Sequence, residues 1–111
     1  MYAQLTYFDG PRTPEELAAH DFAARERIRP AITGLGRSFR VYVLRRHDGS
    51  EIVVSVADSE QALLDAQKAI TGTDLLPGED PALLPGPDRI ELYPVADVRD
   101  INPASESRSS L

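Results

Sequence analysis

Two strand-like runs separated by a short polar turn constrain this chain more than any other feature. Residues 39–46 and 51–57 are both rich in β-branched and aromatic side chains, which favour strands. The turn between them, 47–50, contains Asp48-Gly49, and an Asp-Gly pair is favoured in tight hairpins. The two runs are therefore predicted to be antiparallel neighbours in one sheet.

Local start and stop signals define the other elements. Thr13 followed by Pro14 and Glu16 is typical of a capped helix start, because the Thr and Glu side chains can satisfy free backbone N–H groups. The predicted order is a strand at 2–8, a helix from Thr13 to about Ile32, the hairpin strands, a helix from Ser59 to Ile70 and a strand at 89–95. This βαββαβ order predicts an α+β, ferredoxin-like fold: a four-stranded antiparallel sheet with two helices on one face.

The 111 residues are enough for a single domain, predicted to span 1–101. Within it, 71–88 is a long loop containing Leu-Leu-Pro-Gly twice, and its leucines are expected to pack over the helices or onto a partner chain. The polar, Ser-rich stretch 102–111 is predicted to be a flexible tail.

Composition excludes several classes of function. The net charge of −6 argues against nucleic-acid binding, which needs a basic surface. The absence of cysteine excludes disulfides and thiolate metal sites, and two histidines alone do not make a usual zinc site, so no metal and no cofactor is expected. No apolar run is long enough to span a membrane, and the first residues do not resemble an export signal, so a cytoplasmic location is expected.

The sheet face without helices is expected to be buried by a second copy of the chain. Strand alternation places Ile52, Val54 and Val56 on one side of their strand, which we expect to face the helices. The opposite face then carries too many apolar and aromatic side chains for a solvated surface: Tyr2, Phe8, Val53, Tyr93 and Val95. This pattern predicts a homodimer.

The candidate catalytic residues are Asp21, His20 and Tyr7. On a helical wheel Asp21 lies almost within the apolar stripe of the first helix and His20 lies at its flank. Desolvation would raise the pKa of Asp21, whereas pairing with Arg25, four residues later, would lower it. Asp21 is therefore either a general base at the mouth of a helix–sheet cavity, near Tyr7, or half of an intrahelical ion pair.

A second set of polar side chains is a candidate ligand-binding site. Arg25 is one member, because the basic stretch around it could hold a small anion or form a solvated helix face. The others are expected on the sheet: Gln4, Tyr42, Glu91 and Tyr93. These side chains could line a polar pocket, or they could satisfy one another across a dimer interface.

The layout resembles the dimeric α/β-barrel superfamily, in its antibiotic-biosynthesis-monooxygenase-like branch. The similarity covers roughly residues 2–96 and consists of the helix stop at 34–36, the hairpin at Asp48-Gly49 and the 55–62 sequence that opens the second helix. In that superfamily two sheets pack face to face into a barrel with the helices outside. The resemblance implies a homodimer. Members of the superfamily include cofactor-independent oxygenases, isomerases and haem-degrading enzymes.

Two departures bear on function. Many members have a Trp where this chain has Ala57, and haem-degrading members have an iron-ligating His in the second helix, which is absent here between Ser59 and Ile70. Haem degradation is therefore disfavoured. The prediction is a non-catalytic dimer that binds a small organic ligand or is purely structural. The alternative is a cofactor-independent monooxygenase or isomerase acting on a small aromatic or polyketide-like substrate.

Overall fold

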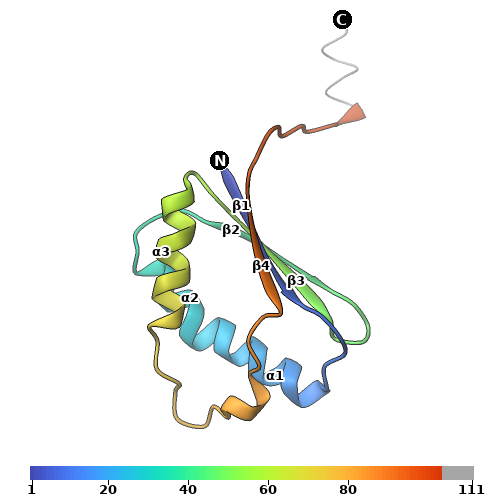
Figure 1. Cartoon of the computed structure of the whole chain (residues 1–111), viewed down its shortest axis with the longest axis vertical. Helices are drawn as coiled ribbons and strands as arrows, with labels where there is room; N and C mark the ends of the chain where they lie inside the picture. The colour runs from blue at the N-terminus through green and yellow to red at the C-terminus, as the bar shows by residue number, and fades with distance from the viewer. Residues whose placement is uncertain (104–111) are drawn as a thin grey trace, which may run out of the picture.

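The computed structural model describes residues 1–103 and shows one sheet with its helices on one side (Figure 1). The strands are β1 (Tyr2–Phe8), β2 (Arg40–Arg45), β3 (Glu51–Ala57) and β4 (Arg89–Pro94). They are all antiparallel to their neighbours, in the order β2-β3-β1-β4. The fold is α+β, and its strand order is compatible with the ferredoxin-like class.

The first predicted helix is divided into three consecutive segments. These are α1 (Pro14–Ala23), a π-helical turn η1 (Ala24–Ile28) and α2 (Arg29–Thr33). Pro30 explains the break, since proline has no N–H for the helical hydrogen bond and its ring crowds the preceding turn. The second helix, α3 (Glu60–Thr71), is continuous, and a short 3₁₀ turn, η2 (Pro81–Leu83), lies in the long loop.

The helix starts follow the predicted capping chemistry. Thr13 Oγ1 accepts a hydrogen bond from the Glu16 N–H at 3.1 Å, and the Glu16 carboxylate accepts one from the Thr13 N–H at 2.9 Å. At α3, Ser59 Oγ accepts from the Ala62 N–H at 3.1 Å. Both helices therefore begin where the sequence indicates.

The β2–β3 turn also holds the segment that precedes α1. Gly49 has φ +89°, and a Cβ there would lie 2.8 Å from the Arg12 carbonyl oxygen, so only glycine fits. The Arg12 N–H donates to the Asp48 carbonyl at 2.8 Å, and the Arg12 side chain donates to the Gly49 carbonyl at 2.8 Å. These contacts fix Arg12 against the base of the hairpin.

The sheet faces are reversed relative to the sequence prediction for β1 and β3. Phe8 contacts His20 of α1 and Gln4 contacts Gln67 of α3, so the even-numbered residues of β1 face the helices. The register pairs these residues with Glu51, Val53, Ser55 and Ala57, which therefore lie on the helix side. The predicted inward set, Ile52, Val54 and Val56, lies on the opposite side, called here the open face. The prediction was wrong because it assigned the more apolar side of β3 to the helices.

Strand β4 follows the prediction. Ile90 and Leu92 pair with Thr6 and Gln4, and Leu92 packs beside the buried cluster under α3, so both lie on the helix side. Its alternate residues lie on the open face: Arg89, Glu91 and Tyr93.

The buried core is small and built mainly of alanine. The buried apolar residues are Ala23, Ala57, Ala62, Leu63 and Ala66, and Leu63 is the largest of them. Three of them, Ala62, Leu63 and Ala66, lie on the inner side of α3, and Ile70 near the end of that helix is half-buried. Because alanine fills little volume, α3 can approach the sheet closely at its buried side.

The long loop between α3 and β4 packs beside α1. The Arg27 guanidinium lies 2.8 Å from the Glu79 carboxylate, whose side chain is 2% exposed, and also donates to Thr73 at 2.8 Å. Leu83 and Leu84 line a groove of about 290 Å³ together with Phe22 of α1, whereas Leu75 of the same loop is 43% exposed.

After β4, the Val95 N–H donates to the Met1 carbonyl at 2.9 Å, and the chain then leaves the domain (Figure 1). The predicted tail 102–111 lies, from residue 104 onward, outside the described residues. Among the described residues, none of the helices has the length and apolar character that crossing a membrane requires.

Candidate functional site

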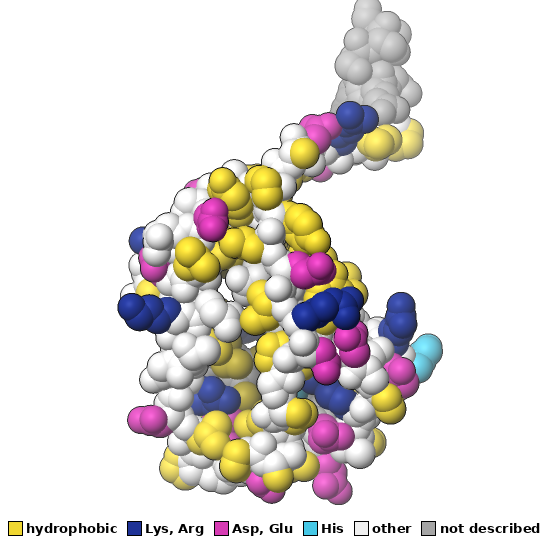
Figure 2. Space-filling model, viewed as in Figure 1, with side chains coloured by type: hydrophobic (Ala, Val, Ile, Leu, Met, Phe, Trp, Pro, Cys, Tyr) yellow, Lys and Arg dark blue, Asp and Glu magenta, His cyan; other side chains and the backbone are white. Residues whose placement is uncertain are grey.

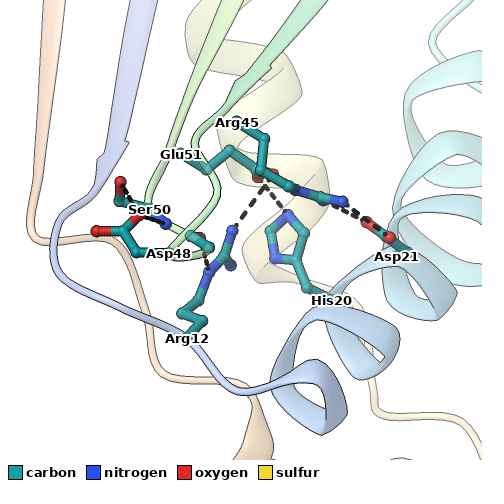
Figure 3. Close-up of polar contacts among 8 residues, drawn as sticks. Arg12, His20, Asp21, Arg45, Asp48, Ser50 and Glu51 are labelled. Carbon is teal, nitrogen blue, oxygen red and sulfur yellow. Dashed lines mark hydrogen bonds and ion pairs between the residues drawn. The ribbon is translucent and has the colours of Figure 1, made fainter.

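A fully buried carboxylate organises one end of the helix–sheet layer (Figure 3). Glu51 is the first residue of β3, and its side chain is 0% exposed. Its Oε1 lies 2.7 Å from Arg45 Nη2 and 3.3 Å from Arg12 Nη2, and its Oε2 lies 2.9 Å from His20 Nε2. The negative charge of Glu51 is thus surrounded by Arg12 from the segment before α1, His20 from α1 and Arg45 from β2. These contacts offset the cost of removing the carboxylate from water.

The cluster extends to the surface through Asp21. Arg45 donates to both Asp21 oxygens, at 2.7 and 3.2 Å, while its Nε donates to Glu51 at 2.8 Å. These hydrogen bonds lower the pKa of Asp21 and raise the pKa of Arg45. Asp21 is 49% exposed, so its carboxylate is an ionised partner of Arg45 at the rim of the layer.

His20 lies between this cluster and an aromatic ring. Phe8 meets the imidazole edge-on, with ring centroids 5.1 Å apart, and the Arg12 guanidinium lies 5.0 Å from the centre of the Phe8 ring. Burial lowers the pKa of His20, against the opposing effect of the Glu51 charge. His20 is therefore held mainly neutral at pH 7, with one ring nitrogen near Glu51.

The middle of the same layer is lined by polar side chains. Gln4 and Ser55 are paired across β1 and β3, and Gln67 reaches down from α3 to within 3.4 Å of Gln4. Thr6 lies next along β1 on the same side. Within the described residues the hydroxyls of Thr6 and Ser55 have no hydrogen-bond partner, although both residues are half-buried. The space-filling view shows the surface hollowed between α3 and β4 (Figure 2).

The open face carries a separate polar network. Arg89 stacks 3.9 Å from the centre of the Tyr7 ring, and the Tyr93 hydroxyl donates to Glu91 at 3.1 Å. The Glu91 carboxylate raises the pKa of Tyr7 and of Tyr93 by hydrogen bonding to their phenol groups. Tyr42 lies on this face at the β2 edge, where it is half-exposed.

The structure therefore divides the predicted site residues other than Arg25 among three places. His20 and Asp21 lie together at the Glu51 cluster, whereas Tyr7 is on the opposite face of the sheet and shares no site with them. The ligand-binding candidates separate too: Gln4 lines the helix–sheet layer, while Tyr42, Glu91 and Tyr93 lie on the open face.

Arg25 does not pair with Asp21, contrary to the helical-wheel expectation. It contacts its neighbour Glu26 at 3.0 Å and lies 5.9 Å from the Phe22 ring, exposed on the outer side of the helix layer. Arg45, at the end of β2, pairs with the Asp21 carboxylate instead of Arg25. Sequence reasoning missed Arg45 and Glu51, since both depend on the pairing of distant strands.

A scan against protein-family models finds no match to this chain, and a search of curated proteins finds no significant similarity. In the part of the chain that the structure describes, no cluster of three or more His, Asp or Glu side chains has the arrangement of a metal site.

Asp21→Asn should reduce the free energy of unfolding by less than about 1 kcal/mol at pH 7, since the Arg45 ion pair is half-exposed. The folded-state pKa of Asp21 lies below its usual value, so its stabilising effect is present at neutral pH and is lost as the pH falls through that lowered pKa. Urea unfolding of both proteins at pH 7 and pH 2.5 measures this. A loss above 2 kcal/mol at pH 7, or one that persists in acid, would contradict the assignment.

Proposed function

We propose that this chain is a homodimeric module that binds a small organic ligand between its helices and its sheet. The polar lining of that layer is the observation that carries the proposal. Gln4, Thr6 and Ser55 all lie on the helix side of the sheet, and the hydroxyls of Thr6 and Ser55 have no hydrogen-bond partner in the described residues. Neither hydroxyl is among the buried polar atoms that lack a partner, so both can be reached from outside the protein, by water or by a small ligand.

The open face supports the dimer. Its apolar and aromatic side chains run across all four strands: Leu5, Tyr7, Tyr42, Leu44, Ile52, Val54, Val56 and Tyr93. Tyr42, Leu44 and Tyr93 are each about half-exposed in the single chain. A continuous apolar sheet face of this kind is unusual in a monomer, and packing it on a second copy would remove it from water. This arrangement is the one implied by the resemblance to dimeric α/β barrels.

Two measurements test the proposal. Light scattering at low micromolar concentration should give about twice the chain mass of 12.2 kDa. A titration with 2-naphthol, a small aromatic alcohol, followed by amide NMR should move the signals of Gln4, Thr6, Ser55 and Gln67. Ser55→Leu should abolish these shifts because the larger side chain fills the space, whereas Ser38→Leu, at an exposed position, should preserve them.

The results can contradict the two parts separately. A mass near that of one chain would exclude the dimer. The absence of shifts at millimolar 2-naphthol, or shifts confined to the open-face residues Tyr42 and Tyr93, would contradict a ligand site in the helix–sheet layer.

The second candidate function is a cofactor-independent monooxygenase or isomerase acting on a small aromatic or polyketide-like substrate. The observation that favours it is His20, a neutral imidazole beside a buried carboxylate, which is an arrangement suited to proton transfer. Oxygen uptake or isomerisation of hydroxylated aromatics by the purified protein tests it. Activity that is lost roughly 100-fold in His20→Gln would support an enzyme, whereas no turnover would leave the binding module.

A further inference from the structure

The segment that follows β4 forms an extended arm, defined here as residues 95–103. The Val95 N–H donates to the Met1 carbonyl, the arm then leaves the domain, and its apolar residues Val98 and Ile101 are 63% and 76% exposed. Isolated exposed apolar residues are common, but two on one protruding segment indicate a contact outside the domain shown in Figure 1.

Strand β2 has an uncovered apolar surface that a second segment could pack against. All its residues are exposed, including the consecutive apolar stretch Val41-Tyr42-Val43-Leu44, with exposures between 48% and 56%. It pairs only with β3, so its other edge offers free backbone N–H and C=O groups. Face-to-face packing of two sheets would cover Tyr42 and Leu44. It would leave Val41 and Val43 uncovered, since these point to the helix side.

We propose that the arm of one copy crosses to the second copy and packs Val98 and Ile101 over Val41 and Val43 at the β2 edge. Charge is complementary between the two segments. Within the described residues neither Arg40, at the start of β2, nor Asp100, in the arm, has an ion-pair partner. The negative charge of Asp100 near the positive charge of Arg40 favours contact between the arm and β2 over contact between two arms or two β2 strands.

The topology favours a second copy over the chain's own β2. Strands β2 and β4 are the opposite edges of the sheet, and the arm starts at the same end of the sheet as Arg40. When two sheets pack face to face about a two-fold axis along the strands, the β4 edge of one copy lies against the β2 edge of the other. The arm then begins beside the Arg40 end of the neighbouring copy.

This inference rests on the proposed homodimer and adds a structural role for the second copy. Val41 and Val43 pair with Ser55 and Val53, so they border the helix–sheet space on its β2 side. An arm seated there would close that side, and each ligand space would contain residues of both chains.

The test uses the absence of cysteine in the natural chain. In the double variant Val41→Cys/Val98→Cys, mild oxidation should link most chains into species of twice the chain mass on a denaturing, non-reducing gel. Peptide mass spectrometry should find the link between positions 41 and 98. The matched control is Leu64→Cys/Val98→Cys, because Leu64 is comparably exposed but lies on the outer face of α3; it should give little of this product.

Three outcomes would overturn the inference. Cross-linking no greater than in the control would show that the arm does not reach β2. An internal link, which leaves chains at single mass, would show that the arm folds onto its own sheet. Light scattering of the wild type distinguishes the homodimer from the arm exchange. A dimeric mass without the 41–98 link would contradict only the arm exchange, whereas the mass of one chain would contradict both.

Discussion

Replacing Glu51 by Gln should reduce the free energy of unfolding by about 3 kcal/mol or more, the largest loss expected from a single polar substitution in this chain. The side chain has no exposure and lies within 3.3 Å of Arg12, His20 and Arg45. Gln keeps the shape but removes the charge, so Arg12, which is nearly buried, would keep its positive charge without an anion. Urea unfolding at pH 7 and fixed chain concentration measures the loss.

Glu26→Gln provides the matched control. Glu26 also pairs with an arginine, at 3.0 Å, but both side chains are about half-exposed or more, so the same substitution should change stability by no more than about 0.5 kcal/mol. If Glu51→Gln were as mild as this control, the carboxylate would be either protonated or hydrated. The cluster would then not hold the hairpin to α1.

The parts of the fold that depend on local chemistry could be predicted from sequence. The Asp48-Gly49 turn, the Thr13 capping box and the alternation of β4 each depend on a few adjacent residues, and each occurs where expected. Pro30 indicates that the last turns of the first helix are disturbed, but the sequence does not specify how the backbone accommodates the lost hydrogen bond.

The apolar character of the side chains could not show which side of β1 and β3 faces the helices. Alternation identifies two sides of a strand but not which side meets the helices. Here the helix side of β3 begins with the buried Glu51 and contains Ser55, whereas Ile52, Val54 and Val56 occupy the open face. In β3 the more apolar side faces away from the helices, which is the reverse of the rule used in the prediction.

Part of the candidate site could be predicted from sequence, because some of its residues are close together in the chain. The helical wheel identified His20 and Asp21, which are adjacent in sequence and lie on the inner side of α1. Glu51 and Arg45 belong to the β2–β3 hairpin, and only tertiary packing brings that hairpin to α1. One signal could have pointed to Glu51: a carboxylate at the start of a strand that is otherwise buried needs a cationic partner.

Val54→Asp should convert the proposed homodimer into a monomer, which is the largest effect expected on assembly. Val54 lies at the middle of the open face, where it pairs with Leu5 on one side and with Tyr42 on the other. In a two-fold dimer the substitution places one carboxylate from each copy in an apolar interface, so desolvation and mutual repulsion both oppose association.

We expect the dissociation constant to rise at least about 1,000-fold, equivalent to roughly 4 kcal/mol, and light scattering at low micromolar concentration should then give a mass near 12.2 kDa. Helical circular dichroism should remain, because Val54 does not contact α1 or α3 from the open face. Leu64→Asp is the control, since Leu64 is 45% exposed on the outer side of α3 and should leave the mass of the dimer unchanged. If Val54→Asp stayed dimeric while Leu64→Asp dissociated, the contact surface would be the helix layer, and the apolar sheet face would require a different partner.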